Sequence, residues 1–124
     1  MTPDQHTILS FLAERVASHA SIERIAVFGS TARADLGPLS DVDVYIIWSN
    51  LDGSDGSLIS DFVQVQTAWQ DWAEELGRLV ERPVSTHNSH PCDPPDDAWP
   101  AIERGLASPT AQIGKVILIP TPAK

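Results

Sequence analysis

The N-terminal segment shows the hydrophobic periodicity of an amphipathic helix. From Thr2 to Val16, apolar side chains recur every three or four residues and form a single stripe. Thr2 can cap the helix, Pro3 suits its first turn, and Gln5 can complete a capping box with Thr2. The pattern predicts a helix that begins next to Thr2 and covers a sheet with its apolar stripe.

A second helical pattern runs from Leu58 to about Val80 and again repeats at three- and four-residue spacing. It includes Trp69 and Trp72, which lie about one turn apart. Large aromatic side chains at this spacing usually bury area against a sheet, so we expect core packing rather than stacking on nucleic acid bases. Surplus apolar surface on this helix would serve as an interface with another subunit or a partner.

Short apolar segments between these helices predict strands. The run at 25–28 carries no charge, 42–48 alternates apolar and polar positions, and shorter candidates lie at 82–87 and 115–119. A last helix is predicted from Asp97 to Arg104, ending at Gly105. The expected fold is α/β, a single small domain spanning 1–124 with a mixed sheet flanked by helices.

The segment 29–44 carries the candidate chemistry. Gly29 and Ser30 follow the first predicted strand, and Asp41 and Asp43 belong to the second. Residues two apart on a strand share a face, so the two carboxylates should lie together with their Cα atoms roughly 7 Å apart. Mg²⁺ prefers such hard oxygen ligands and usually takes one or two carboxylates together with substrate phosphates.

Phosphate binding is predicted for the turn that precedes the carboxylates. Backbone N–H groups at Gly29 and Ser30 and the hydroxyl of Ser30 can hold a triphosphate where a strand turns into a helix, because unpaired donors and the helix dipole face it. Arg33, one turn further, can reach the phosphates with its planar guanidinium. The reaction class indicated is nucleotidyl transfer.

At these residues the chain resembles the minimal nucleotidyltransferases (MNT) of the DNA polymerase beta-like superfamily. The signature of that superfamily is Gly-Ser, then Ala-Arg-Gly, then Ser-Asp-x-Asp before apolar residues, and it is matched in register by Gly29, Ser30, Ala32, Arg33, Ser40, Asp41 and Asp43. The resemblance implies an α/β nucleotidyltransferase domain, ATP or another nucleoside triphosphate, Mg²⁺, and transfer of a nucleotide to a hydroxyl. Asp41 and Asp43 would be the catalytic, metal-binding residues.

Two positions depart from the family pattern. Ala34 stands where glycine is common, and Ser85 stands where the family usually carries a third carboxylate. That carboxylate helps to hold the metal and can accept a proton, so its loss affects turnover more than nucleotide binding. His87 shares the strand face of Ser85 and is an alternative ligand or proton acceptor, as are the aspartates in 88–97.

The net charge of the chain limits the kinds of partner that it can bind. The formal net charge is −9, with 17 acidic and 8 basic side chains, which disfavours a nucleic acid acceptor. No apolar run reaches the ~20 residues of a membrane span and no export signal precedes the first helix, so we expect a cytoplasmic protein. Cys92 is the single cysteine, which excludes an internal disulfide.

Three functional hypotheses stay open at this point. Short family members often resemble the antitoxin of a toxin-antitoxin pair, in which the transferase adds AMP to a HEPN-type toxin. The chain can instead be a catalytically degenerate relative that neutralises a partner by contact, which Ser85 favours. The third hypothesis is a small-molecule enzyme of the aminoglycoside-modifying type, completed by homo-oligomerisation.

Overall fold

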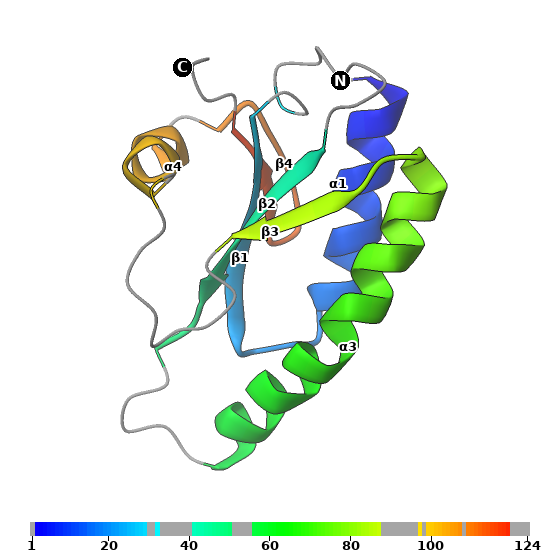
Figure 1. Cartoon of the computed structure of the whole chain (residues 1–124). Coiled ribbons are helices and arrows are strands. Elements are labelled where there is room, and N and C mark those ends of the chain that lie inside the picture. The colour runs from blue at the N-terminus through cyan, green and yellow to red at the C-terminus, as the bar shows by residue number, and fades with distance from the viewer. Residues whose placement is uncertain are drawn as a thin grey trace.

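The computed structural model describes residues 2–29, 32, 41–50, 56–87, 97, 99–107 and 109–119. Within these residues the chain forms three helices and five strands, and their bounds are α1 (Pro3–Val16), β1 (Ile22–Phe28), β2 (Val42–Trp48), α3 (Gly56–Val80), β3 (Val84–His87), α4 (Trp99–Leu106), β4 (Ala111–Ile113) and β5 (Val116–Leu118). The expected α/β class is confirmed (Figure 1).

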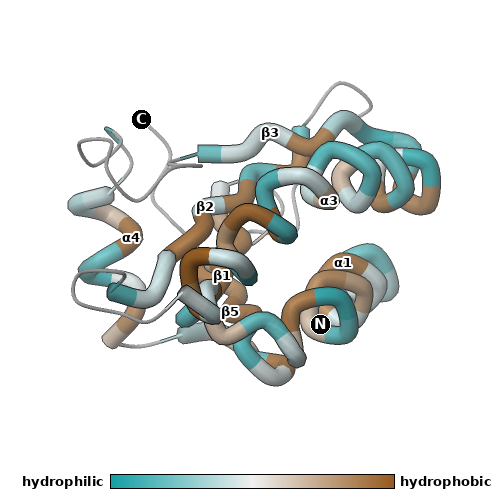
Figure 2. Tube along the Cα trace, turned by 90° about the horizontal axis from the view of Figure 1, so that it is seen from below, coloured by the Kyte–Doolittle hydropathy of each residue, from teal (hydrophilic) through white to brown (hydrophobic). Residues whose placement is uncertain are grey.

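The five strands form one mixed sheet in the order β3-β2-β1-β5-β4. The central strand β1 pairs antiparallel with β2 and parallel with β5, and β2 pairs parallel with β3. The sheet separates two layers of helices: α1 and α3 cover one face, and α4 lies on the other (Figures 1 and 2). Figure 2 also shows that hydrophobic residues are concentrated in the central strands.

The first helix forms for the reasons that the sequence predicts. The Thr2 hydroxyl accepts from the Gln5 backbone at 3.1 Å, and the Gln5 side chain accepts from the Thr2 backbone at 3.0 Å. This capping box satisfies N–H groups that a helix start leaves without partners. Gln5 is almost fully buried, and its amide also donates to the Ala32 carbonyl at 3.3 Å, which links the start of α1 to the segment after β1.

Alternation along β1 and β2 divides the core between the two faces. Val42, Val44 and Ile46 join the larger cluster beneath α1 and α3, whereas Tyr45 packs with Ile102 of α4 in the smaller one. The tryptophans of α3 are partly buried against the larger cluster, which confirms the prediction of core packing. Along α3, however, Ile59, Val63 and Leu79 remain about half exposed, at 48%, 54% and 58%.

The C-terminal part of the prediction needs two corrections. Gly105 lies inside α4 rather than ending it, because the helix runs from Trp99 to Leu106. A Cβ at Gly105 would overlap the side chain of Ile119, so glycine is required there by the close approach of α4 to the sheet. The strand β4 was not predicted, since its three residues are too few to show an alternation.

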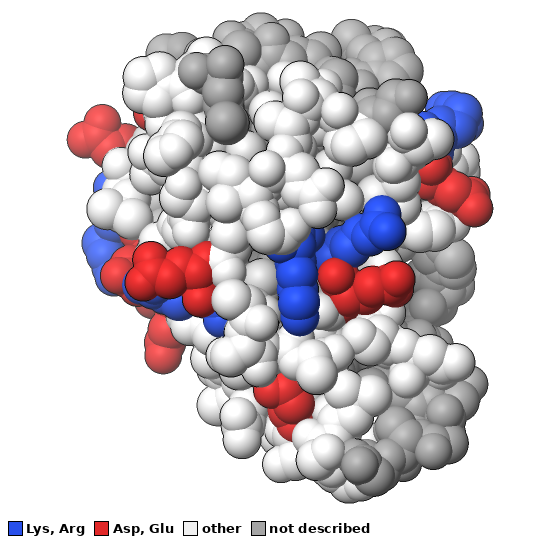
Figure 3. Space-filling model, turned by 180° about the vertical axis from the view of Figure 1, so that it is seen from behind, with Lys and Arg blue, Asp and Glu red and all other residues white. Residues whose placement is uncertain are grey.

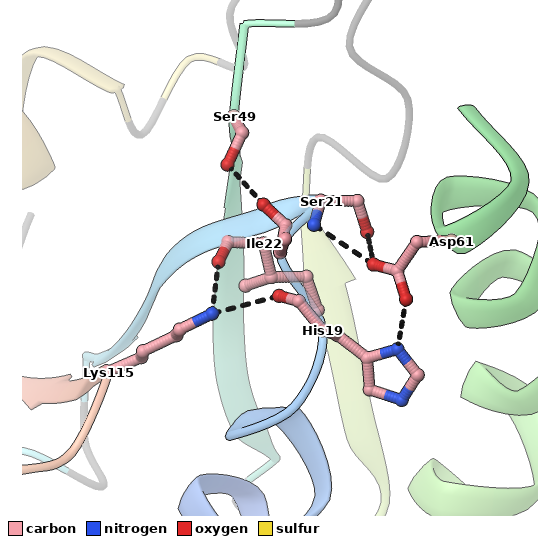
Figure 4. Close-up of polar contacts among 7 residues, drawn as sticks. His19, Ser21, Ile22, Ser49, Asp61 and Lys115 are labelled. Atoms are coloured by element: carbon pink, nitrogen blue, oxygen red, sulfur yellow. Dashed lines mark hydrogen bonds and ion pairs between the residues drawn. The ribbon is translucent and has the colours of Figure 1, made fainter. Parts of the chain in front are cut away.

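A polar cluster fixes the turn between α1 and β1 to α3 (Figure 4). Asp61 of α3 accepts from the Ser21 backbone at 2.9 Å and from the Ser21 hydroxyl at 2.6 Å, and it lies 2.7 Å from Nδ1 of His19. Lys115 donates to the carbonyls of His19 and Ile22 on the other side of the turn. The start of β1 is therefore held by contacts from two distant parts of the chain.

Candidate active site

The two carboxylates of the predicted site lie at the start of β2. Asp41 directly precedes the strand and Asp43 is its second residue. Their neighbours Val42 and Val44 are fully buried on the face covered by α1 and α3. Alternation therefore places Asp41 and Asp43 on the opposite face, where the Asp43 side chain keeps 30% of its surface exposed.

The turn after β1 lies directly against one of these carboxylates. Phe28 pairs with Asp43 across β1 and β2, so Gly29 follows at the level of the carboxylates. Gly29 has a φ of 70°, and a Cβ built on it would lie only 2.7 Å from Oδ2 of Asp43. Both the backbone conformation and the close approach require glycine at this position.

The strand β3 supplies a partner for each carboxylate. Ser85 pairs in register with Asp43, and its hydroxyl donates to Oδ2 of Asp41 at 2.7 Å. His87 pairs with Tyr45, and its Nε2 lies 3.6 Å from Oδ1 of Asp43. Ser85 thus lies beside the carboxylates, where the sequence comparison with the family placed a third acidic residue.

His87 is positioned by an aromatic contact. Its ring meets Phe28 edge to face, with centroids 5.1 Å apart. Phe28 is almost fully buried at the end of β1. Sequence reasoning did not identify Phe28 as part of the site, because the contact depends on β1 and β3 both flanking β2.

Two predicted nucleotide-binding residues, Ser30 and Arg33, lie outside the described residues, as do Ala34 and most of 88–97. Gly29, Asp41, Asp43, Ser85 and His87 are the predicted residues that the structure brings together. Their convergence comes from the adjacent positions of β1, β2 and β3 in the sheet.

The donor set suits Mg²⁺ if the substrate completes it. Among the residues that the structure describes, no group of three or more His, Cys, Asp and Glu side chains is arranged to hold a metal ion. Asp41 and Asp43 nevertheless offer hard carboxylate oxygens, and the Gly29 turn lies close to Asp43. A Mg²⁺ ion that takes two carboxylates and phosphate oxygens would fit this chemistry.

The cluster of Ser21, His19 and Asp61 contains the residue types of a catalytic triad but not its order. The Ser21 hydroxyl donates to Asp61 rather than to an imidazole, and Ser21 is fully buried. A nucleophilic serine needs an adjacent base and access to substrate. The arrangement is therefore a structural tie between α3 and the turn before β1.

Comparison with known protein families identifies the class. The family model described as "Polymerase beta, Nucleotidyltransferase" matches residues 11–95, well over half of the chain. The match spans β1, Gly29, both carboxylates and β3. The chain belongs to this family of nucleotidyltransferases, whose domains generally use Mg²⁺.

Searches among curated proteins and among solved structures gave no match. A separate structural finding concerns membranes: no helix within the described ranges has the length and apolar character needed to cross a bilayer.

Proposed function

We propose that this chain transfers a nucleoside monophosphate, AMP from ATP, to a hydroxyl of an acceptor protein. The observation that carries the proposal is the contact between the Gly29 turn and Asp43, with Asp41 on the same face. It joins a turn suited to phosphates with a pair of metal-binding carboxylates. The family match gives nucleotidyl transfer as the reaction class.

In this proposal each residue has a defined task. Backbone N–H groups of the Gly29 turn, with Ser30 and Arg33, bind the triphosphate. Asp41 and Asp43 hold Mg²⁺, which when bound would neutralise negative charge on the phosphoryl oxygens. The acceptor hydroxyl would attack the α-phosphorus and lose its proton, and the bond between the α-phosphorus and the bridging oxygen would break, releasing pyrophosphate.

The hydrogen bond from Ser85 favours a second candidate function. It occupies one oxygen of Asp41, and a neutral hydroxyl is a weaker proton acceptor than a carboxylate. The alternative is therefore a degenerate nucleotidyltransferase that binds and neutralises a partner without turnover. We favour the enzyme because His87 lies beside Asp43 and can complete the site.

The acceptor proposed is a partner protein, as in MNT antitoxins that modify a HEPN-type toxin. The formal net charge of −9 supports a protein over a nucleic acid. Homo-oligomerisation is the other way of supplying an acceptor surface. A cytoplasmic location, where nucleoside triphosphates are abundant, agrees with this proposal.

The test is a labelling reaction. The purified chain is incubated with Mg²⁺, each of the four labelled nucleoside triphosphates, and the proteins that co-purify from its host. We expect one acceptor to gain a nucleotide-sized mass. Asp41→Asn and Asp43→Asn should each reduce labelling by about two orders of magnitude or more, as expected on losing an electrostatic contact to the transition state.

Asp71→Asn is the matched control, because Asp71 is exposed on α3 and should leave labelling unchanged. Unchanged labelling in both Asp41→Asn and Asp43→Asn would show that the metal site is wrong. Ser85→Asp separates the two candidate functions when Mg²⁺ affinity is measured by calorimetry. A degenerate protein should gain affinity from the restored carboxylate, whereas a site already completed by His87 should gain little.

A further inference from the structure

A groove of about 730 Å³ lies between α3 and the edge strand β3. One wall is α3 from Gln66 to Arg78, and the other is the segment from Arg82 to Thr86. Val84 and Thr86 alternate with Ser85 and His87 along β3, so the groove and the candidate active site lie on opposite faces of this strand. The groove is therefore a separate site.

The two walls are fixed to each other by contacts between α3 and the segment leading into β3. The indole N–H of Trp69 donates to the Thr86 hydroxyl at 2.8 Å. At the other end, the backbone N–H of Arg82 donates to the backbone carbonyl of Gly77 at 3.0 Å. A Cβ on Gly77 would lie 2.9 Å from the backbone carbonyl oxygen of Arg82. These contacts form the groove without a ligand, so binding needs little rearrangement.

Two arginines give the groove an unbalanced positive charge. Nε of Arg82 is buried and has no hydrogen-bond partner among the residues that the structure describes. Within the described part of the chain, no carboxylate forms an ion pair with Arg82 or with the exposed Arg78. The one acidic residue of the lining, Glu74, accepts a hydrogen bond from Gln70. Because Arg78 and Arg82 both line the groove, a carboxylate bound there would pair with their guanidinium groups.

The dimensions of the groove suit an extended peptide. The α3 wall from Gln66 to Arg78 is about 18 Å long at 1.5 Å per residue. An extended chain covers this length with about five or six residues. The Trp69 ring, whose polar atom is already satisfied, offers apolar surface between the two ends.

A peptide is favoured over a nucleic acid by the surrounding charge. Arg78 and Arg82 are the only positive side chains among the described lining residues, so a nucleic acid, with a phosphate at every nucleotide, would extend past them into the field of a chain with a formal net charge of −9. On the face shown in Figure 3, acidic and basic side chains lie next to each other. In the groove itself, the positive charge comes from Arg78 and Arg82, which fits a short acidic segment.

We propose that this groove binds an extended, acidic segment of a partner protein, with its carboxylates on Arg78 and Arg82. The inference does not depend on nucleotidyl transfer, because it uses no residue of the candidate active site. It predicts that partner binding survives when Asp41 and Asp43 are replaced.

The probes are fluorescein-labelled eight-residue peptides in which leucine alternates with four glutamates, with two glutamates and two glutamines, or with four glutamines. Fluorescence anisotropy with the whole chain should show affinity that rises with the number of glutamates and falls with added salt. Arg78→Gln combined with Arg82→Gln should weaken binding of the four-glutamate peptide by about tenfold or more, since hydrogen bonds to charged groups carry at least this factor.

Gln70→Glu provides a variant that keeps both arginines and changes an exposed position, and it should also weaken binding by repulsion. Arg104→Gln on α4 is the matched control and should have no effect. Equal affinity for the glutamate and glutamine peptides, or an equal loss in Arg104→Gln, would overturn the proposal. Tighter binding of an eight-nucleotide single-stranded RNA than of the four-glutamate peptide would overturn it as well.

Discussion

Gly29 decides how closely the turn after β1 can approach Asp43. A side chain at this position would meet the carboxylate at 2.7 Å, and the φ of 70° is unfavourable for any residue with a Cβ. The same glycine therefore sets a backbone conformation and a distance within the candidate active site. Ser85 also acts through one side chain, since the hydrogen bond from its hydroxyl fixes one oxygen of Asp41.

Replacing Gly29 with alanine tests this role. We expect Gly29→Ala to destabilise the fold by about 1–2 kcal/mol, the cost of a left-handed conformation with a Cβ, and to lower nucleotide labelling. Thermal unfolding and the labelling reaction measure the two effects. Gly56→Ala is the matched control, because a Cβ there meets nothing within 4 Å, and its free energy of unfolding should change by less than about 0.5 kcal/mol. Equal effects of the two substitutions would contradict this role of Gly29.

Among the secondary-structure elements, α3 depends on a polar tie as well as on apolar packing. Only Val65, Leu76 and Val80 are fully or almost fully buried along its described length, while Asp61 binds the turn before β1. Burial raises the pKa of Asp61, but the hydrogen bonds from Ser21 and from His19 lower it by more. The pKa of Asp61 is therefore below its ordinary value, because the folded state favours the charged carboxylate.

This lowered pKa makes the tie sensitive to acid. Its contribution is fully present above the unfolded pKa of about 3.9, and it is lost as pH falls through the lower folded pKa. We expect Asp61→Asn to cost about 1–3 kcal/mol at neutral pH, because hydrogen bonds to a charged acceptor are lost. The difference from the unmodified chain should shrink below about pH 4.

Urea unfolding at several pH values measures this change. Asp71→Asn, on the exposed face of the same helix, is the control and should stay within about 0.5 kcal/mol of the unmodified chain. A cost of Asp61→Asn that does not vary with pH would show that the charge of Asp61 contributes nothing.

Most elements follow from local patterns. The capping box predicted the start of α1, and alternation predicted β2 from Val42 to Trp48. Prediction was poorer near the C-terminus. In the sequence, Gly105 resembles the end of a helix. Glycine is needed there because Ile119, 14 residues away in the chain, leaves no room for a side chain.

At the scale of the whole molecule, the excess of acidic side chains disfavours the approach of nucleic acid. The formal net charge of −9 produces a field that repels phosphate backbones at moderate salt. The family description names a polymerase as well as a nucleotidyltransferase, and the acidic net charge of this chain is the property that argues against a nucleic acid acceptor.

We therefore expect a 20-nucleotide single-stranded RNA to bind more weakly than about 100 μM at 150 mM salt, the weak end of non-specific binding. Fluorescence anisotropy measures it, with a lysine-rich protein of similar size as the positive control. Submicromolar binding that weakens steeply with salt would contradict the proposal of a protein acceptor.

By itself, the sequence determined α1 and α3, the central strands, the position of the Gly29 turn, and the shared face of Asp41 and Asp43. These features depend on neighbours within a few residues, where backbone geometry leaves few choices. The tertiary structure decided that β3 lies beside β2, so that the Ser85 hydroxyl binds Asp41 and His87 contacts Asp43. It also formed the groove at Arg82. These arrangements depend on which distant segments pair and in which register, and no local pattern encodes that.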